Sequence, residues 1–109
     1  MALTQPVPAT VYSNLVSFPV WVDAVFLGAA SAETYTVPAD AGYALVTCNL
    51  PVYGCVSGTA VVPTTEITDG SGSFYMSAGM QCKLDSGDSL SLIRATAANT
   101  IVTIGVYRA

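Results

Sequence analysis

Carboxylates are the side chains of this sequence best suited to acid–base catalysis, because the chain has no histidine. Two carboxylates can hydrolyse a glycosidic bond when one acts as the acid and the other as the base or nucleophile. The chain carries seven, at Asp23, Glu33, Asp40, Glu66, Asp69, Asp85 and Asp88. All but Asp23 and Glu33 lie in or beside Gly/Ser turns, where capping and solubility account for them. Without imidazole there is also no Ser-His or Cys-His nucleophile pair, so we expect no enzyme activity.

Metal and cofactor binding are not expected either. Asp69, Asp85 and Asp88 could bind Ca²⁺ if their loops converge, but calcium requires several oxygens in a defined loop. Turn carboxylates are therefore the better interpretation. A zinc site takes four ligands, whereas the chain offers 3 cysteines and 0 histidines. The sequence predicts no cofactor.

The cysteines allow two interpretations. Cys48 and Cys55 flank a turn-like segment and could face each other across a hairpin, which would leave Cys82 unpaired. An odd number of cysteines without a secretion signal favours free, buried thiols, with a Cys48–Cys55 bridge as the alternative. Alternation over residues 43–48 places Cys48 on the same face as Val46. We predict that Cys48 is a buried thiol, packed with Val46 and a C-terminal hairpin.

The low charge of the chain points to assembly with other subunits. It has 109 residues, enough for one domain, of which 52% are hydrophobic and 9% charged, against about 25% charged in typical domains. A surface so poor in charge is explained most simply if much of it is buried against other copies or other proteins. The three basic residues, Lys83, Arg94 and Arg108, form no patch, and the net charge is −4, so nucleic acid is not an expected partner.

Membrane insertion and secretion are not expected. Residues 15–30 are largely apolar, but Asp23 lies in the middle, Pro19 breaks any helix, and the run is too short to span a bilayer. The N-terminus has neither the charged region nor the contiguous apolar region of a signal peptide. We expect a protein made in a cytoplasm that leaves it only as part of a larger particle.

The C-terminal stretch, residues 84–107, is the clearest guide to the fold. Asp85-Ser86-Gly87-Asp88 is a turn signal between strand-like runs. Residues 89–94 alternate, with Leu90 and Leu92 on one face, and residues 100–107 are rich in β-branched side chains. We expect these last two strands to form a hairpin whose faces other β-structure must cover.

The remaining strands are expected at residues 18–27, 35–38, 43–48, 52–57, 59–62, 73–77 and 80–84, with a weak strand at 64–68. Residues 9–16 alternate loosely and could be a first strand. Their spacing is that of sandwiches and barrels, and no window carries a sustained helical stripe. The fold class predicted is all-β: a single-domain antiparallel β-sandwich, jelly-roll-like, of about eight to ten short strands. Residues 1–8 are predicted to be an extended N-terminal arm and residues 9–109 the sandwich domain.

The candidate contact residues follow from this division. Phe18, Trp21 and Phe26 lie in the most apolar run and are expected in the core, or in a core shared with another subunit. Together with Tyr107 they are the candidate oligomer or core interface. The arm supplies Leu3, Gln5, Pro6 and Val7 as candidate contacts with a neighbouring protein.

Two stretches resemble known proteins. The run from Leu84 to Leu92, with its Gly87-Asp88 turn, followed by Thr100 to Tyr107, resembles the closing strands of TNF/C1q-like trimeric jelly rolls. It departs from that family's aromatic-Gly-aromatic closing strand in having Ile104-Gly105-Val106. Tyr35-Thr36-Val37-Pro38-Ala39 is similar to a strand opening of small phage virion proteins. The resemblance, over the last two-thirds of the chain, implies a symmetric, non-enzymatic assembly module.

The function expected is therefore structural. The leading hypothesis is a trimeric capsid decoration (cement) protein that binds the major capsid protein of a bacteriophage head, with the virion as its location. The first alternative is a tail-fibre or head-fibre tip that binds a host receptor or glycan through residues 69–72 or 95–99. The second is a free-standing carbohydrate-binding lectin.

Overall fold

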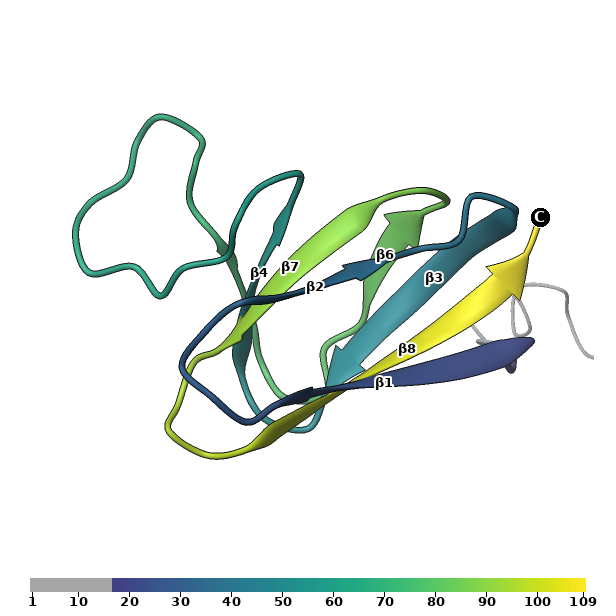
Figure 1. Cartoon of the computed structure of the whole chain (residues 1–109), viewed down its shortest axis with the longest axis horizontal. Helices are drawn as coiled ribbons and strands as arrows, with labels where there is room; N and C mark the ends of the chain where they lie inside the picture. Colours follow the sequence, from purple (N-terminus) through teal and green to yellow (C-terminus); the bar gives the residue numbers. More distant parts are fainter. Residues whose placement is uncertain (1–16) are drawn as a thin grey trace, which may run out of the picture.

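Two four-stranded antiparallel sheets pack face to face in the computed structural model, which describes residues 17–109 (Figure 1). The first sheet has the order β1-β8-β3-β6 and the second the order β2-β7-β4-β5. The strands are β1 (Trp21–Leu27), β2 (Glu33–Thr36), β3 (Ala41–Cys48), β4 (Val52–Val56), β5 (Phe74–Met76), β6 (Cys82–Asp85), β7 (Ser89–Arg94) and β8 (Thr100–Arg108). Among residues 17–109 no helix has the length and apolar character needed to cross a membrane.

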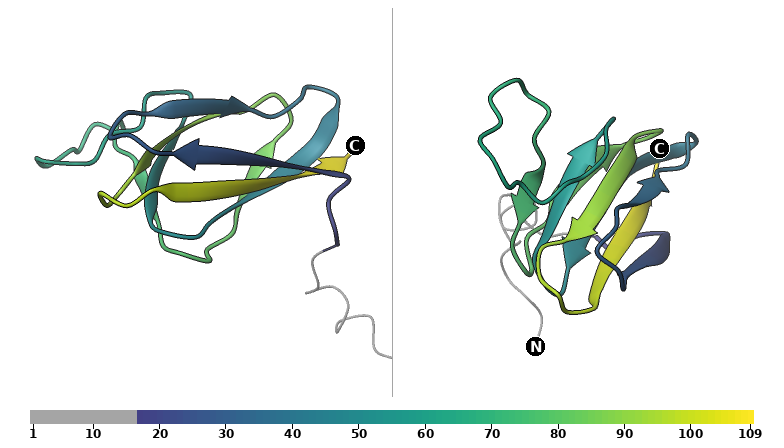
Figure 2. Two further views of the ribbon diagram at one scale, coloured as in Figure 1. Left: turned by 60° about the horizontal axis from the view of Figure 1, so that its bottom comes forward. Right: turned by 60° about the vertical axis from the view of Figure 1, so that its left-hand side comes forward.

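The pairing of the strands is that of a jelly roll. β1 pairs with β8, β2 with β7, β3 with β6 and β4 with β5, all antiparallel, so the chain folds as a long two-stranded ribbon wrapped into a sandwich. The two layers are seen from different sides in Figure 2. The predicted all-β, single-domain sandwich is confirmed, with eight strands in the described residues. The predicted arm at residues 1–8 and the predicted strand at 9–16 lie outside the described residues.

Alternation along the strands builds the core between the sheets. In β3, Ala44, Val46 and Cys48 are buried while the intervening side chains are half-buried, as the sequence predicts. In β8, Val102 and Ile104 point into the same core. The second sheet contributes Val52, Met76, Leu90 and Leu92. A pattern of period two thus decides which face of each sheet turns inward.

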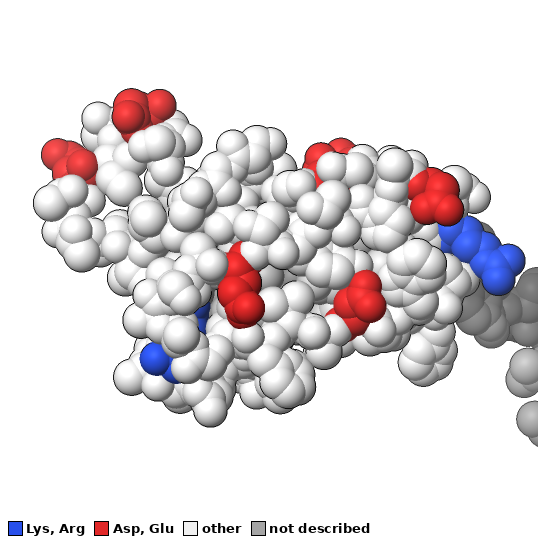
Figure 3. Space-filling view, viewed as in Figure 1, with Lys and Arg blue, Asp and Glu red and all other residues white. Residues whose placement is uncertain are grey.

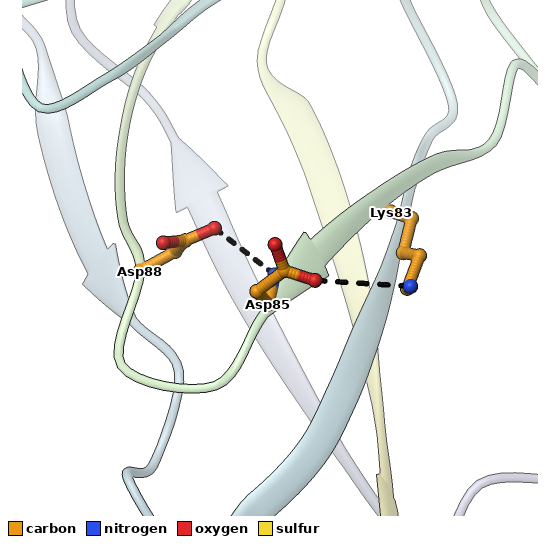
Figure 4. Close-up of polar contacts among 3 residues, drawn as sticks. All are labelled: Lys83, Asp85 and Asp88. Carbon is orange, nitrogen blue, oxygen red and sulfur yellow. Dashed lines mark hydrogen bonds and ion pairs between the residues drawn. The ribbon is translucent and has the colours of Figure 1, made fainter.

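The turn before β7 forms as predicted (Figure 4). Gly87 has a φ of 80°, the left-handed conformation that favours glycine. The carboxylate of Asp88 accepts a hydrogen bond from the Asp85 amide at 3.0 Å, and Lys83 forms an exposed ion pair with Asp85 at 3.7 Å. These carboxylates stabilise the turn.

The predicted C-terminal hairpin is wrong. β7 pairs with β2 and β4 in the second sheet, whereas β8 pairs with β1 and β3 in the first. The connection over residues 95–99 therefore crosses from one sheet to the other. A sheet-to-sheet corner and a hairpin have the same local pattern of two strands and a polar loop, and the partners that decide between them are distant in sequence.

The strands predicted at residues 59–62 and 64–68 are also absent, because the chain from Ser57 to Ser73 is a long loop that extends away from the sandwich (Figure 1). One point of it is anchored: the Ala60 amide donates to the Ser91 hydroxyl on β7 at 2.9 Å, and both residues are buried. The β-branched composition of this segment suggested strands. The loop instead bonds to β7 through the Ser91 side chain, and it pairs with no strand.

The three cysteines are free, as predicted. Cys48 is buried and lies opposite Val102 of β8, so it contacts the predicted strand although no hairpin exists. Cys55 and Cys82 are only half-buried, which differs from the expectation of three buried thiols. Cys48 and Cys55 lie in different sheets, so the alternative of a hairpin-spanning bridge does not hold.

Candidate assembly surface

The outer face of the first sheet carries large apolar side chains in the open. Residues that lie opposite each other in antiparallel strands share a face, and Phe26 lies opposite Ile101 while Val22 lies opposite Gly105. Phe26 is 68% exposed and Val22 58%. Because the core-facing residues of β8 are Val102 and Ile104, these pairs point outward. The edge of the sheet formed by β1 therefore presents apolar surface to solvent.

The segment before β1 crosses this outer face. The hydroxyl of Tyr107 donates a hydrogen bond to the carbonyl of Ser17 at 2.6 Å. Pro19 packs directly over Gly105, where a Cβ would come within 2.9 Å of the proline ring. Tyr107 is also stacked on Tyr43, with 4.6 Å between ring centroids. These contacts fix Ser17 and Pro19 on the sheet and leave the side chain between them, Phe18, 97% exposed.

A shallow groove of about 330 Å³ lies beside Phe18 on the same face. Its walls include Val22, Leu45 and Pro19, with the polar side chains of Thr47, Thr103 and Gln81. None of the described residues that line it is charged. An exposed aromatic side chain and an uncharged groove thus stand side by side on one sheet face. We call this region, defined by Phe18, Val22, Phe26, Ile101 and the groove, the outer apolar face.

The candidate interface residues do not all lie on this surface. Phe18 and Phe26 do, so neither belongs to the core of this chain. Trp21 is half-exposed and lies opposite Val106, on the core side of β1 at its open end. Tyr107 is 8% exposed, because Tyr43 and Ser17 cover it. It nevertheless lines the groove, so it belongs to the outer apolar face as a covered residue.

Two residues of this surface, Val22 and Ile101, are not among the interface residues predicted from the sequence. The alternation of residues 100–107 carried a usable signal, since Ile101 falls out of step with Val102 and Ile104. The arm candidates Leu3, Gln5, Pro6 and Val7 lie outside the described residues.

The carboxylates play structural parts. Asp23 of β1 accepts a hydrogen bond from the Tyr35 hydroxyl of β2 at 2.5 Å, which ties the two sheets together at that edge. Burial, followed by this bond to Asp23, raises the pKa of Tyr35 to about 12. In the projecting loop, hydrogen bonds from the Ser71 hydroxyl and amide lower the pKa of Asp69. Within the described part of the chain, no three Cys, Asp or Glu side chains gather as a metal-ligand set.

Charge is sparse on the face that Figure 3 shows, where a few acidic and basic side chains leave wide uncharged areas. The one ion pair among the described residues, between Lys83 and Asp85, is exposed on both sides. Exposed ion pairs contribute little to stability, so this pair adds little to the stability of the fold.

Comparison with known proteins yields no match: no protein-family model, no curated protein and no solved structure is significantly similar to the chain.

Proposed function

We propose that this protein is a non-enzymatic structural subunit that associates with copies of itself through the outer apolar face. The single observation that carries the proposal is the exposure of Phe18 beside an uncharged groove on an apolar sheet face. Exposed apolar patches rimmed by polar groups are typical of protein–protein contact sites. The low charge of the chain, 9%, agrees with burial of such a face.

We further propose that the assembly is a trimer and that it decorates a bacteriophage capsid. Its support is the resemblance of the last two strands to closing strands of trimeric jelly rolls, together with the jelly-roll order of the strands. In a trimer, each subunit uses two sides, and a standard interface buries about 800 Å² on each partner. Phe18 and the groove beside it supply complementary surfaces, a projecting ring on one copy and an uncharged hollow on the next.

The test is substitution of Phe18 in the full chain. Burial of a phenylalanine side chain is worth about 1.5–3 kcal/mol. Phe18→Ser is therefore expected to weaken self-association by roughly 10- to 150-fold per contact, as measured by sedimentation equilibrium. The matched control is Ile67→Ser, which removes an exposed apolar side chain from the projecting loop.

Two results would contradict the proposal. One is a wild-type protein that stays monomeric at high concentration. The other is a Phe18→Ser variant that associates as tightly as the Ile67→Ser control. If association depends on Phe18, cryo-electron microscopy of particles then locates the assembly on a capsid or elsewhere.

A fibre tip that binds a host surface is the second candidate, because the loop from Ser57 to Ser73 extends far from the sandwich (Figure 1). Structureless loops longer than about 12–15 residues are uncommon in compact domains and are often functional. This loop exposes Val61, Val62 and Ile67 beside the carboxylates Glu66 and Asp69. Specific binding of a glycan array by the wild type, lost when Ile67 is changed to Ser, would favour attachment or a lectin role over decoration.

A further inference from the structure

The two edges of the sandwich differ in how they are protected against the addition of a further strand. On one side, edge strands β1 and β2 turn charged groups toward the space between the sheets. Asp23 lies opposite Ile104 and is bonded to Tyr35, and Glu33 lies opposite Leu92. Inward-pointing charges on edge strands oppose the addition of a further strand. This edge is protected.

The other edge, between β5 and β6, has no such protection among the described residues. The inward side chains of β6 are Cys82 and Leu84, opposite Val46 and Ala44, and neither is charged. On β5 the side chains opposite Val52 and Gly54 are Met76 and Phe74. Lys83, near the middle of β6, lies opposite Leu45 and directs its ammonium group to Asp85 on the outer face, although the residue also lines the cavity at this edge.

A small apolar cavity opens at this unprotected edge. Its volume is about 160 Å³, and its walls include Val46, Leu84, Leu90, Met76 and Phe74. An apolar cavity of about 150 Å³ takes a molecule the size of benzene. Phe74 is exposed although it points toward the inside, so the cavity has an apolar mouth. One branched aliphatic or aromatic side chain would fill it.

The edge of β6 can accept a strand that carries such a side chain. In the described part of the chain, β6 pairs with β3 alone, so the backbone groups along its other edge have no strand partner. An added strand would form main-chain hydrogen bonds there and direct every second side chain inward, above the cavity. β5 offers less, because it has only 3 residues.

We propose that residues 9–16 of this chain are that strand. Residues 1–16 contain no charged side chain, and residues 9–16 place Val11 and Leu15 on one face. The point where this segment joins the described chain is close by: Ser17 lines the same groove as Gln81, the residue that precedes β6. Eight extended residues span about 26 Å, enough to reach the β6 edge of the same subunit or of a neighbour. The proposal does not require self-association through the outer apolar face.

Cys82 makes the pairing measurable in the full chain, because it faces inward on β6 and lines the cavity. Cysteine is introduced singly in place of Val11 or Leu15, and a mild oxidant such as copper phenanthroline is added. We expect a disulfide to Cys82, identified by peptide mass spectrometry, in at least one of these variants. The matched controls, Thr10→Cys and Asn14→Cys, place the thiol on the opposite face and are expected not to crosslink.

The gel mobility of the crosslinked protein tells which copy supplies the strand. A disulfide within one chain runs at the monomer mass, and one between chains runs at the dimer mass. Either result supports residues 9–16 as the occupant. No crosslink to Cys82 from position 11 or 15, or equal crosslinking from positions 10 and 14, would overturn the proposal.

A second measurement does not depend on crosslinking geometry. Thr10→Pro removes a backbone N–H from the segment, so the segment has one donor fewer for pairing with β6. We expect iodoacetamide to modify Cys82 roughly tenfold faster in this variant than in the wild type. The rate at Cys55, which lies in the second sheet, serves as the internal reference and should not change. Equal rates at Cys82 in both proteins would count against the proposal.

Discussion

Gly42 offers the sharpest test of how the first sheet holds together. It lies in β3 where the register with β8 shifts between Ala41 and Tyr43. A Cβ added to Gly42 would lie 2.1 Å from the carbonyl oxygen of Arg108 and 2.7 Å from its carbonyl carbon. Both atoms are backbone, so a rotamer change cannot relieve the contact. Alanine at this position must displace the end of β8.

The loss of unfolding free energy in Gly42→Ala follows from the contacts that this displacement disrupts. Overpacking in a well-packed site costs about 1–3 kcal/mol. The displaced strand also carries Tyr107, whose stacking on Tyr43 is worth about 0.5–1.5 kcal/mol. Replacing glycine lowers the conformational entropy of the unfolded chain, which offsets the destabilisation by about 0.4–1 kcal/mol. The net destabilisation is about 2 kcal/mol, or roughly 8–16 °C in Tm for a domain of this size.

Thermal unfolding followed by circular dichroism measures this shift at low protein concentration. The matched control is Gly72→Ala in the projecting loop, where the nearest atom to an added Cβ is 3.8 Å away. We expect the control to melt within about 2 °C of the wild type. If Gly42→Ala melts as the control does, the close approach of β3 to the end of β8 is wrong. Since Tyr107 holds Ser17, the same variant should also weaken self-association through Phe18.

Strands with one core-facing and one outward face were predictable from the sequence, because their burial follows a period of two. Residues 43–48 show this, with Ala44, Val46 and Cys48 buried as expected. Partner choice was not predictable. The pattern of residues 89–107 is the same for a hairpin and for two strands in different sheets, and only pairing with β1 to β4 decides between them.

The candidate surface was partly predictable for a related reason. Phe18 and Phe26 were singled out as interface or core residues, and the structure leaves both exposed. Composition could not separate those outcomes, because a buried core and a buried interface select the same side chains. Tyr107 faces outward on β8 but is covered there, for a reason invisible in its own segment: Tyr43 and Ser17, which cover it, are distant in sequence.

Two further predictions concern the buried thiol of Cys48 and the partly buried phenol of Tyr35. Cys48→Ala should cost about 1 kcal/mol of unfolding free energy through a small cavity, and the wild-type Tm should not change with reductant, since Cys48 is free. Tyr35 gives a pH dependence, because its pKa is raised to about 12 in the folded protein from an unfolded value of 10.0. Below pH 10 the phenol is protonated in both states and its bond to Asp23 contributes fully. As the pH rises toward 12, the unfolded state ionises first, so this contribution is lost. Because Tyr35 is partly exposed, we expect about 1 kcal/mol, measured by urea unfolding at pH 9 and 11.5 as the difference between the wild type and Tyr35→Phe. Parallel losses in the two proteins would show that the Tyr35–Asp23 bond does not stabilise this edge of the sandwich.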